Sequence, residues 1–113
     1  VITVENEDAI DRFTAIAGSG PGYVFELARA YTEAAMALGF DGKQARAMVL
    51  GTLQGTVAMA AGSDQSLEDL RNSVTSKAGT TAAGLDALNG KGELSALLSA
   101  TLEAAYDRAV ELR

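Results

Sequence analysis

The chain has 113 residues, 48% of them hydrophobic, and a formal net charge of −6 at pH 7. This is enough apolar material for one domain with a buried core, so a disordered or fibrous protein is excluded. The nine Lys and Arg residues are scattered along the sequence. Nucleic acids and anionic membrane surfaces are bound by clustered positive charge, so we expect neither as a partner.

The sequence contains no cysteine and no histidine. A disulfide framework, a thiolate nucleophile and an imidazole base are therefore excluded, and so is the commonest ligand of transition metals. The Asp and Glu residues show no metal-ligand spacing, so we expect no metal site. The lack of cysteine fits a cytoplasmic protein.

The first ten residues read "VITVENEDAI", with no initiating methionine and no basic stretch followed by an apolar one. This is not the pattern of a secretory signal. The β-prone "VITV" is typical of the end of a strand that belongs to something upstream. We therefore expect the chain to be part of a longer protein.

Alanine and leucine recur three or four residues apart, which is the period of helices that pack on one another, so we predict an all-α fold. A first helix is expected over residues 7–17, ending at the glycines of "GSGP". Pro21 then suits the first turn of a second helix, and Gly39 suits its end. The apolar stripes predicted for these two helices are Ile10, Phe13, Thr14 and Ala17, and Val24, Leu27, Ala28, Tyr31, Ala35 and Leu38.

Asp41 is expected to cap a third helix that runs to about residue 61. Residues 47–63, "AMVLGTLQGTVAMAAGS", carry no charge on any side, which is typical of a helix buried all round. A membrane span is the alternative, but the run is shorter than about 20 residues and is interrupted by polar side chains. We therefore expect a helix–helix interface with a second protein surface, most simply in a homodimer, or in a higher oligomer.

Three further helices follow from their start and stop signals. Ser66 and Asp69 resemble a capping box that opens a short helix to about residue 73. A fifth helix is expected over residues 81–88, before "NGKG". The last is expected to be a long amphipathic helix with the stripe Leu94, Leu97, Leu98, Thr101, Ala105, Ala109 and Leu112.

The carboxylates mostly fall on predicted polar helix faces. Arg29 lies at helical spacing from both Glu26 and Glu33. We interpret these as surface ion pairs rather than as catalytic groups.

The stretch "AGSGPG", residues 17–22, is rich in glycine and leads into a helix. It lacks the Lys-Ser/Thr of a phosphate-binding loop and the preceding strand of a dinucleotide fingerprint. We interpret it as a tight corner between helices and expect no cofactor-binding residues in this chain.

The stretch "SKAGTT", residues 76–81, places a glycine and two threonines where a helix begins. The first amides of a helix lack intrahelical acceptors and its dipole favours negative charge, so a small carboxylate would fit there. A threonine that only caps its own helix explains the same residues. The residues alone leave both interpretations open.

Residues 67–89, "LEDLRNSVTSKAGTTAAGLDALN", resemble the signature region of the pyrroline-5-carboxylate reductase family. Residues 11–25, "DRFTAIAGSGPGYVF", resemble the same family's entry into its C-terminal domain. The likeness implies that residues 1–113 form a helical bundle of the 6-phosphogluconate dehydrogenase C-terminal type, in an intertwined homodimer. It also implies an N-terminal Rossmann domain, absent from this chain, that binds NADPH or NADH.

The family reduces the cyclic imine of pyrroline-5-carboxylate to L-proline. The resemblance implies that the backbone of Gly79, Thr80 and Thr81 binds the substrate carboxylate, and that the catalytic Thr81 hydroxyl hydrogen-bonds the ring nitrogen. Ser76 would shape the loop, and Ala78 would contribute to the substrate site. Lys77 and Ala78 stand where many members have Pro-Gly, which affects the path of the loop.

Two other interpretations of the sequence remain. The chain could serve only as an oligomerisation module without a substrate site, or as a free-standing helical adaptor that binds a partner helix. In the first case the signature loop would have no role in substrate binding.

Overall fold

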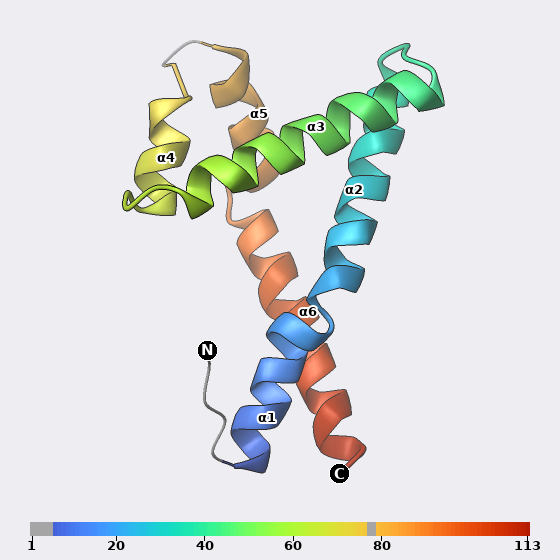
Figure 1. Cartoon of the computed structure of the whole chain (residues 1–113), viewed down its shortest axis with the longest axis vertical. Coiled ribbons are helices and arrows are strands. Elements are labelled where there is room, and N and C mark those ends of the chain that lie inside the picture. The colour runs from blue at the N-terminus through green and yellow to red at the C-terminus, as the bar shows by residue number, and fades with distance from the viewer. Residues whose placement is uncertain (1–5, 77–78) are drawn as a thin grey trace. The chain divides into compact units, whose positions relative to one another are not determined.

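The computed structural model describes residues 6–76 and 79–113, and this part of the chain is helical with no strand. The predicted all-α class is confirmed, whereas the predicted strand end at residues 1–4 lies outside the described residues. The elements in chain order are α1 (Glu7–Phe13), the π-helix η1 (Thr14–Gly18), α2 (Gly20–Ala37), α3 (Gly42–Ala61), α4 (Leu67–Ser73), α5 (Thr80–Asn89) and α6 (Glu93–Glu111) (Figure 1).

These elements fall into two compact units. The first unit comprises Val1–Val24 and Asp86–Arg113, and the second comprises Phe25–Leu85. The first therefore joins the two ends of the chain, while the second holds most of α2, all of α3 and α4, and the start of α5.

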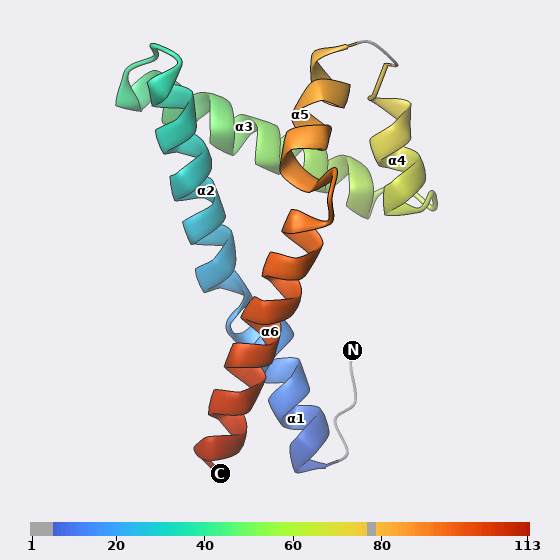
Figure 2. The same cartoon turned by 180° about the vertical axis from the view of Figure 1, so that it is seen from behind.

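In the first unit α6 packs against α1 and η1, and both views show α6 beside this segment (Figure 1 and Figure 2). Two side-chain contacts tie the ends of the chain together. The Tyr106 hydroxyl on α6 donates a hydrogen bond to the Asp8 carboxylate on α1. Arg113 Nε donates to Asp11 Oδ2 at 2.7 Å, and Asp11 is buried. The buried carboxylate is thus paired, as burial of a charge requires.

The first helix differs from its prediction because its second half is a π-helix. The Ser19 N–H donates to the Thr14 carbonyl at 2.9 Å, five residues back, which widens the turn. The chain then enters α2 at Gly20, with Pro21 in the first turn as predicted.

The predicted apolar stripe of this first helix is not the face that the chain buries. Asp11 and Ala15 are the buried positions, whereas the side chains of Ile10 and Phe13 remain 49% and 38% exposed. The reason is that α6 packs on the face carrying Asp11 and Ala15.

In the second unit the helix ends follow the sequence signals. Gly39 ends α2 with φ +108°, a conformation that favours glycine. Asp41 then caps α3: its Oδ1 accepts from the Gln44 N–H at 2.8 Å, and Gln44 Oε1 accepts from the Asp41 N–H at 3.4 Å. This reciprocal capping box confirms the predicted start of α3.

Within its own chain α3, which holds most of the chargeless run of residues 47–63, is buried on one side only, and the expected interface with a second protein surface would have to cover the other side. Ala45 and Val49 are buried, whereas Val57 and Met59 are 64% and 63% exposed. A single chain has too few neighbouring helices to cover every face of α3. An apolar surface of this kind is typical of a protein–protein interface. Among the described residues, no helix is both long and apolar enough to span a membrane.

Candidate functional site

The loop that carries the signature residues follows α4. This short helix begins where Ser66 Oγ accepts from the Asp69 N–H at 3.0 Å, as predicted. At its end the Thr75 hydroxyl donates to the Arg71 carbonyl at 2.7 Å. Both ends of α4 are therefore satisfied locally, and the chain leaves it through Ser76 (Figure 1).

Ser76 and Gly79 meet across the loop. The Gly79 N–H donates to the Ser76 carbonyl at 3.3 Å. A Cβ atom added at Gly79 would overlap the Ser76 hydroxyl and lie 3.5 Å from the Ser76 Cβ. The Ser76 hydroxyl therefore fills the space beside Gly79, and a side chain at position 79 would require this hydroxyl to turn away. Ala78, also predicted as a substrate-binding residue, lies outside the described residues, as does Lys77.

Helix α5 begins at Thr80, one residue before its predicted start. The Ala83 N–H donates to the Gly79 carbonyl at 3.3 Å, so Gly79 is the residue that precedes the first turn. The first-turn amides are those of Thr80, Thr81 and Ala82, which have no acceptor four residues back within α5. The predicted substrate-binding backbone of Gly79, Thr80 and Thr81 includes two of these three amides, and Ala82 supplies the third.

The two threonines are exposed side chains in the first turn of α5. The capping position itself is occupied by Gly79, which has no side chain to accept a hydrogen bond. A side-chain cap from Thr80 or Thr81 would have to come from inside the helix, where such caps are unusual. Both hydroxyls lie in the first turn of α5, at the end of the helix where its dipole is positive.

The carboxylate side chains and the glycine-rich stretch bear on metal and dinucleotide binding. In residues 6–76 and 79–113, no three His, Cys, Asp or Glu side chains are grouped as metal ligands. The glycines of "AGSGPG" lie in helices, with Gly18 in η1 and Gly20 and Gly22 in α2. A dinucleotide fingerprint needs its glycines in the turn between a strand and a helix, so this stretch does not have that form.

Residues 7–112 match the family model for the pyrroline-5-carboxylate reductase dimerisation domain. The chain belongs to the pyrroline-5-carboxylate reductase family. The match covers the signature loop and every described helix, so the resemblance recognised in two stretches of the sequence extends over the whole domain.

Relatives of this family support the same assignment. The pyrroline-5-carboxylate reductase of Staphylococcus aureus is 38% identical over 107 residues, which are 95% of this chain and 39% of that protein. The Staphylococcus haemolyticus enzyme is 40% identical over 112 residues, 99% of this chain and 41% of that protein. The chain thus spans about two fifths of the length of the relatives that it matches.

Solved structures of pyrroline-5-carboxylate reductases have the same helical fold. The structure from Coxiella burnetii has a TM-score of 0.92 and 40% identity, covering 99% of this chain and 41% of that one. The NADP-bound pyrroline carboxylate reductase of Plasmodium falciparum has a TM-score of 0.87 and 30% identity, covering 93% of this chain and 40% of that one. The fold of the reductase dimerisation domain is therefore the fold of this chain.

Proposed function

We propose that this chain is the C-terminal, dimer-forming and substrate-binding domain of an enzyme that reduces 1-pyrroline-5-carboxylate to L-proline. The observation that carries the proposal is the start of α5. There Gly79, whose missing Cβ leaves room for the Ser76 hydroxyl, precedes two exposed threonines and three first-turn amides. Because the chain belongs to the reductase family, we propose 1-pyrroline-5-carboxylate as the substrate that binds at this helix start.

The substrate carboxylate is proposed to bind at the first turn of α5. Backbone N–H groups at a helix start point outward, and the helix dipole favours an anion there. The Gly79 N–H already donates to the Ser76 carbonyl. The amides of Thr80 and Thr81, joined by that of Ala82, are therefore the stronger donors to a carboxylate, and Gly79 contributes by allowing close approach.

Thr81 is proposed to orient the reacting imine. The N–H of the protonated ring nitrogen would donate a hydrogen bond to the Thr81 hydroxyl oxygen. This hydrogen bond would help to orient the ring. A reduced nicotinamide supplies a hydride to the imine carbon, and the C=N electron pair moves onto nitrogen to give the neutral secondary amine. Because the imine is already protonated, a neutral threonine is sufficient and no histidine is required.

The nicotinamide cofactor, NADPH or NADH, is proposed to bind to an N-terminal Rossmann domain outside these 113 residues. This division fits the length of the relatives and the helical form of the "AGSGPG" segment. A cytoplasmic location is part of the same proposal.

Two copies of the chain are proposed to form a homodimer. The family model is that of a dimerisation domain, and apolar side chains such as Val57 and Met59 are exposed on α3. Burial of these side chains against a second copy would supply the core that one chain lacks.

A comparison of two substrates tests the proposed site in the full-length reductase. 1-Pyrroline has the same imine as 1-pyrroline-5-carboxylate but no carboxylate, so it should lose the charge-assisted hydrogen bonds at the start of α5. Such bonds are worth roughly 1.5–3 kcal/mol, so we expect kcat/KM for 1-pyrroline to be lower by about 10- to 150-fold or more. Equal kcat/KM values for the two imines would instead favour a domain that serves only in oligomerisation.

A further inference from the structure

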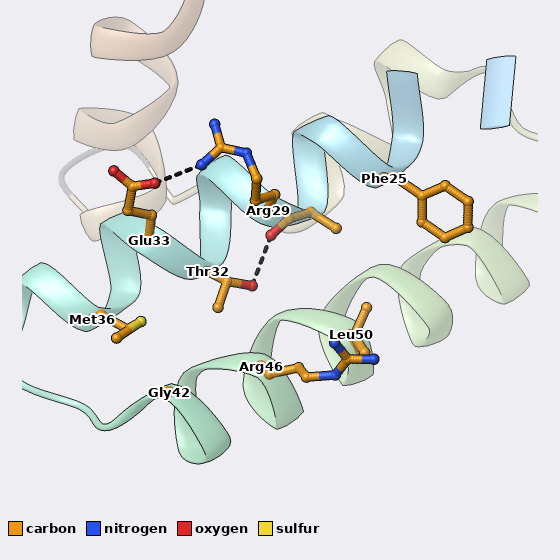
Figure 3. Close-up of a pocket in the computed structure, with 9 residues that line it drawn as sticks. Phe25, Arg29, Thr32, Glu33, Met36, Gly42, Arg46 and Leu50 are labelled. Carbon is orange, nitrogen blue, oxygen red and sulfur yellow. Dashed lines mark hydrogen bonds and ion pairs between the residues drawn. The ribbon is translucent and has the colours of Figure 1, made fainter. Parts of the chain in front are cut away.

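Ion pairs in the described part of the chain are of two kinds. Most join residues about one turn apart on a single helix, as Arg29 and Glu33 do on α2 at 2.6 Å (Figure 3). The pairs of Arg113 join separate elements: its Nε lies 2.7 Å from Asp11 Oδ2, and its Nη2 lies 3.8 Å from Asp8 Oδ1. Exposed pairs within one helix add little to stability, whereas pairs between elements restrict how those elements lie.

The contacts of Arg113 belong to a polar cluster between α1 and α6. The Tyr106 hydroxyl donates to Asp8 Oδ1, and Arg12 Nε lies 3.0 Å from Asp8 Oδ2. The side chain of Asp11 is only 13% exposed, and Tyr106 is half-buried. Because little water reaches these groups, their hydrogen bonds are stronger than those of the exposed pairs. We call Asp8, Asp11, Tyr106 and Arg113 the α1/α6 clasp.

Apolar packing alone does not fix α1 on α6. Within residues 7–18, Ala15 is the one hydrophobic residue that is buried, while Ile10 and Phe13 stay exposed. Helix α1 is seven residues long, which is too short for a helix to be stable by itself. The π-helix η1 then separates α1 from α2, and π-turns are points at which helices bend. The direction of α1 therefore depends on the α1/α6 clasp.

Helix α6 is also tied at its start, to the end of α5. Asn89 Oδ1 accepts from the Ser95 N–H at 3.1 Å, and Asn89 Nδ2 donates to Ser95 Oγ at 3.2 Å. Helix α5 is the one whose first turn is the proposed substrate site. Helix α1 is the first that the structure describes, and the proposed cofactor domain precedes it. Thus α6 is attached both to the helix that would bind substrate and to the helix that would follow the cofactor domain.

We propose that Tyr106 and Arg113 are positioning residues for the reduction: through the α1/α6 clasp they set the direction of α1, and so align the cofactor domain for hydride transfer to the imine. This inference rests on the proposed function. A displacement of reacting atoms by about 1 Å can lower a rate by about 100-fold, even when its cause lies far from the chemistry. Loss of one clasp contact shifts the aligned population by no more than the free energy of that contact, so a smaller effect is expected.

Two matched variants of the full-length reductase test the inference. Arg113→Gln removes the ion pairs to α1, while Arg108→Gln makes the same change at an ion pair with Glu111 that stays within one turn of α6. We expect Arg113→Gln to lower kcat by about three- to tenfold, with KM for 1-pyrroline-5-carboxylate within about twofold of the parent. Its primary deuterium isotope effect on kcat should be at least as large as that of the parent, because hydride transfer is the step that slows. Arg108→Gln should match the parent in all three quantities.

Tyr106→Phe is a second test that does not depend on the folding of Arg113→Gln. It removes the other clasp contact and should lower kcat in the same way, at a temperature at which circular dichroism shows the enzyme fully folded. A parent enzyme that does not reduce 1-pyrroline-5-carboxylate would contradict the proposed function itself. An active parent, with a folded Arg113→Gln or Tyr106→Phe that melts at a lower temperature but keeps the parental kcat, would show that the clasp only stabilises the fold and would overturn the inference.

Discussion

Ser76 and Gly79 share one small space at the start of α5. The Gly79 N–H donates to the Ser76 carbonyl, and the Ser76 hydroxyl lies where a side chain at position 79 would have to go. The lack of a Cβ at position 79 lets the Ser76 hydroxyl pack against the residue that precedes the first turn of α5. The proposed carboxylate site therefore depends on the Ser76–Gly79 contact, which holds the loop against the start of α5.

Gly79→Ala in the full-length reductase should lower kcat/KM for 1-pyrroline-5-carboxylate by about tenfold, equivalent to ~1.4 kcal/mol. The added methyl group must displace the Ser76 hydroxyl, which packs against the residue before the first turn of α5. Gly84→Ala is the matched control, since it lies on the same helix and its added methyl group meets nothing within 4 Å. If both variants retain parental kinetics, the close packing of Ser76 and Gly79 has no part in substrate binding.

The chain should be at least dimeric at micromolar concentration, as measured by light scattering behind a sizing column. Leu53→Asp on α3 should dissociate or unfold it, because Leu53 is half-buried already and an unpaired buried charge costs several kcal/mol. Gln65→Glu, an exposed change in the segment between α3 and α4, serves as the control. A stable and well-folded parent of monomer mass would count against the dimer.

The chain by itself should neither bind NADPH nor oxidise it with 1-pyrroline-5-carboxylate, because its glycine-rich stretch lies in helices. NADPH fluorescence in a titration measures binding, and absorbance at 340 nm measures turnover. The full-length reductase assayed in parallel is the positive control. Turnover by the purified 113-residue chain would contradict the proposed division of labour between two domains.

Stability should fall at alkaline pH through Tyr106. The hydrogen bond that its hydroxyl donates to Asp8, together with desolvation, raises the pKa of Tyr106 above the ordinary value. Because the folded state favours the protonated phenol, this contribution is fully present below pH about 10 and is lost as the pH rises through the raised pKa.

Melting temperatures across pH 7–11 measure this effect. Tyr106→Phe should be less stable than the parent at neutral pH, and the difference should shrink above pH about 10. Tyr31→Phe, at a 44% exposed position on α2, should not show this pattern. A difference between parent and Tyr106→Phe that is constant with pH would argue against the Tyr106–Asp8 hydrogen bond.

The helix boundaries could be predicted because they depend on neighbours three to five residues away. Asp41 and Gln44 form their capping box within one turn, and Gly39 ends α2 through its own backbone angles. The Tyr106–Asp8 contact could not be predicted in this way, since 98 residues separate its partners. Periodicity also showed that Ile10 lies on an apolar stripe, but not that the chain would leave this stripe uncovered.

In the sequence, a glycine and two threonines at a predicted helix start indicated the candidate site. The family resemblance strengthened this interpretation. Composition and spacing alone could not choose between a cap and a ligand site. The position of Gly79 immediately before the first turn bears on that choice, because it moves both threonines inside the helix.

The central claim is that Thr81 binds substrate, and Thr81→Val in the full-length reductase tests it most directly. This change keeps the shape of the side chain and removes one charge-assisted hydrogen bond worth roughly 1.5–3 kcal/mol. We therefore predict a fall in kcat/KM of about 10- to 150-fold, with the dimer intact. Thr101→Val, which removes a hydroxyl that donates to the Leu97 carbonyl of α6, should leave the kinetics unchanged. Thr81→Val kinetics within about twofold of the parent, with a loss of about 1 kcal/mol in stability, would show that Thr81 only caps its helix.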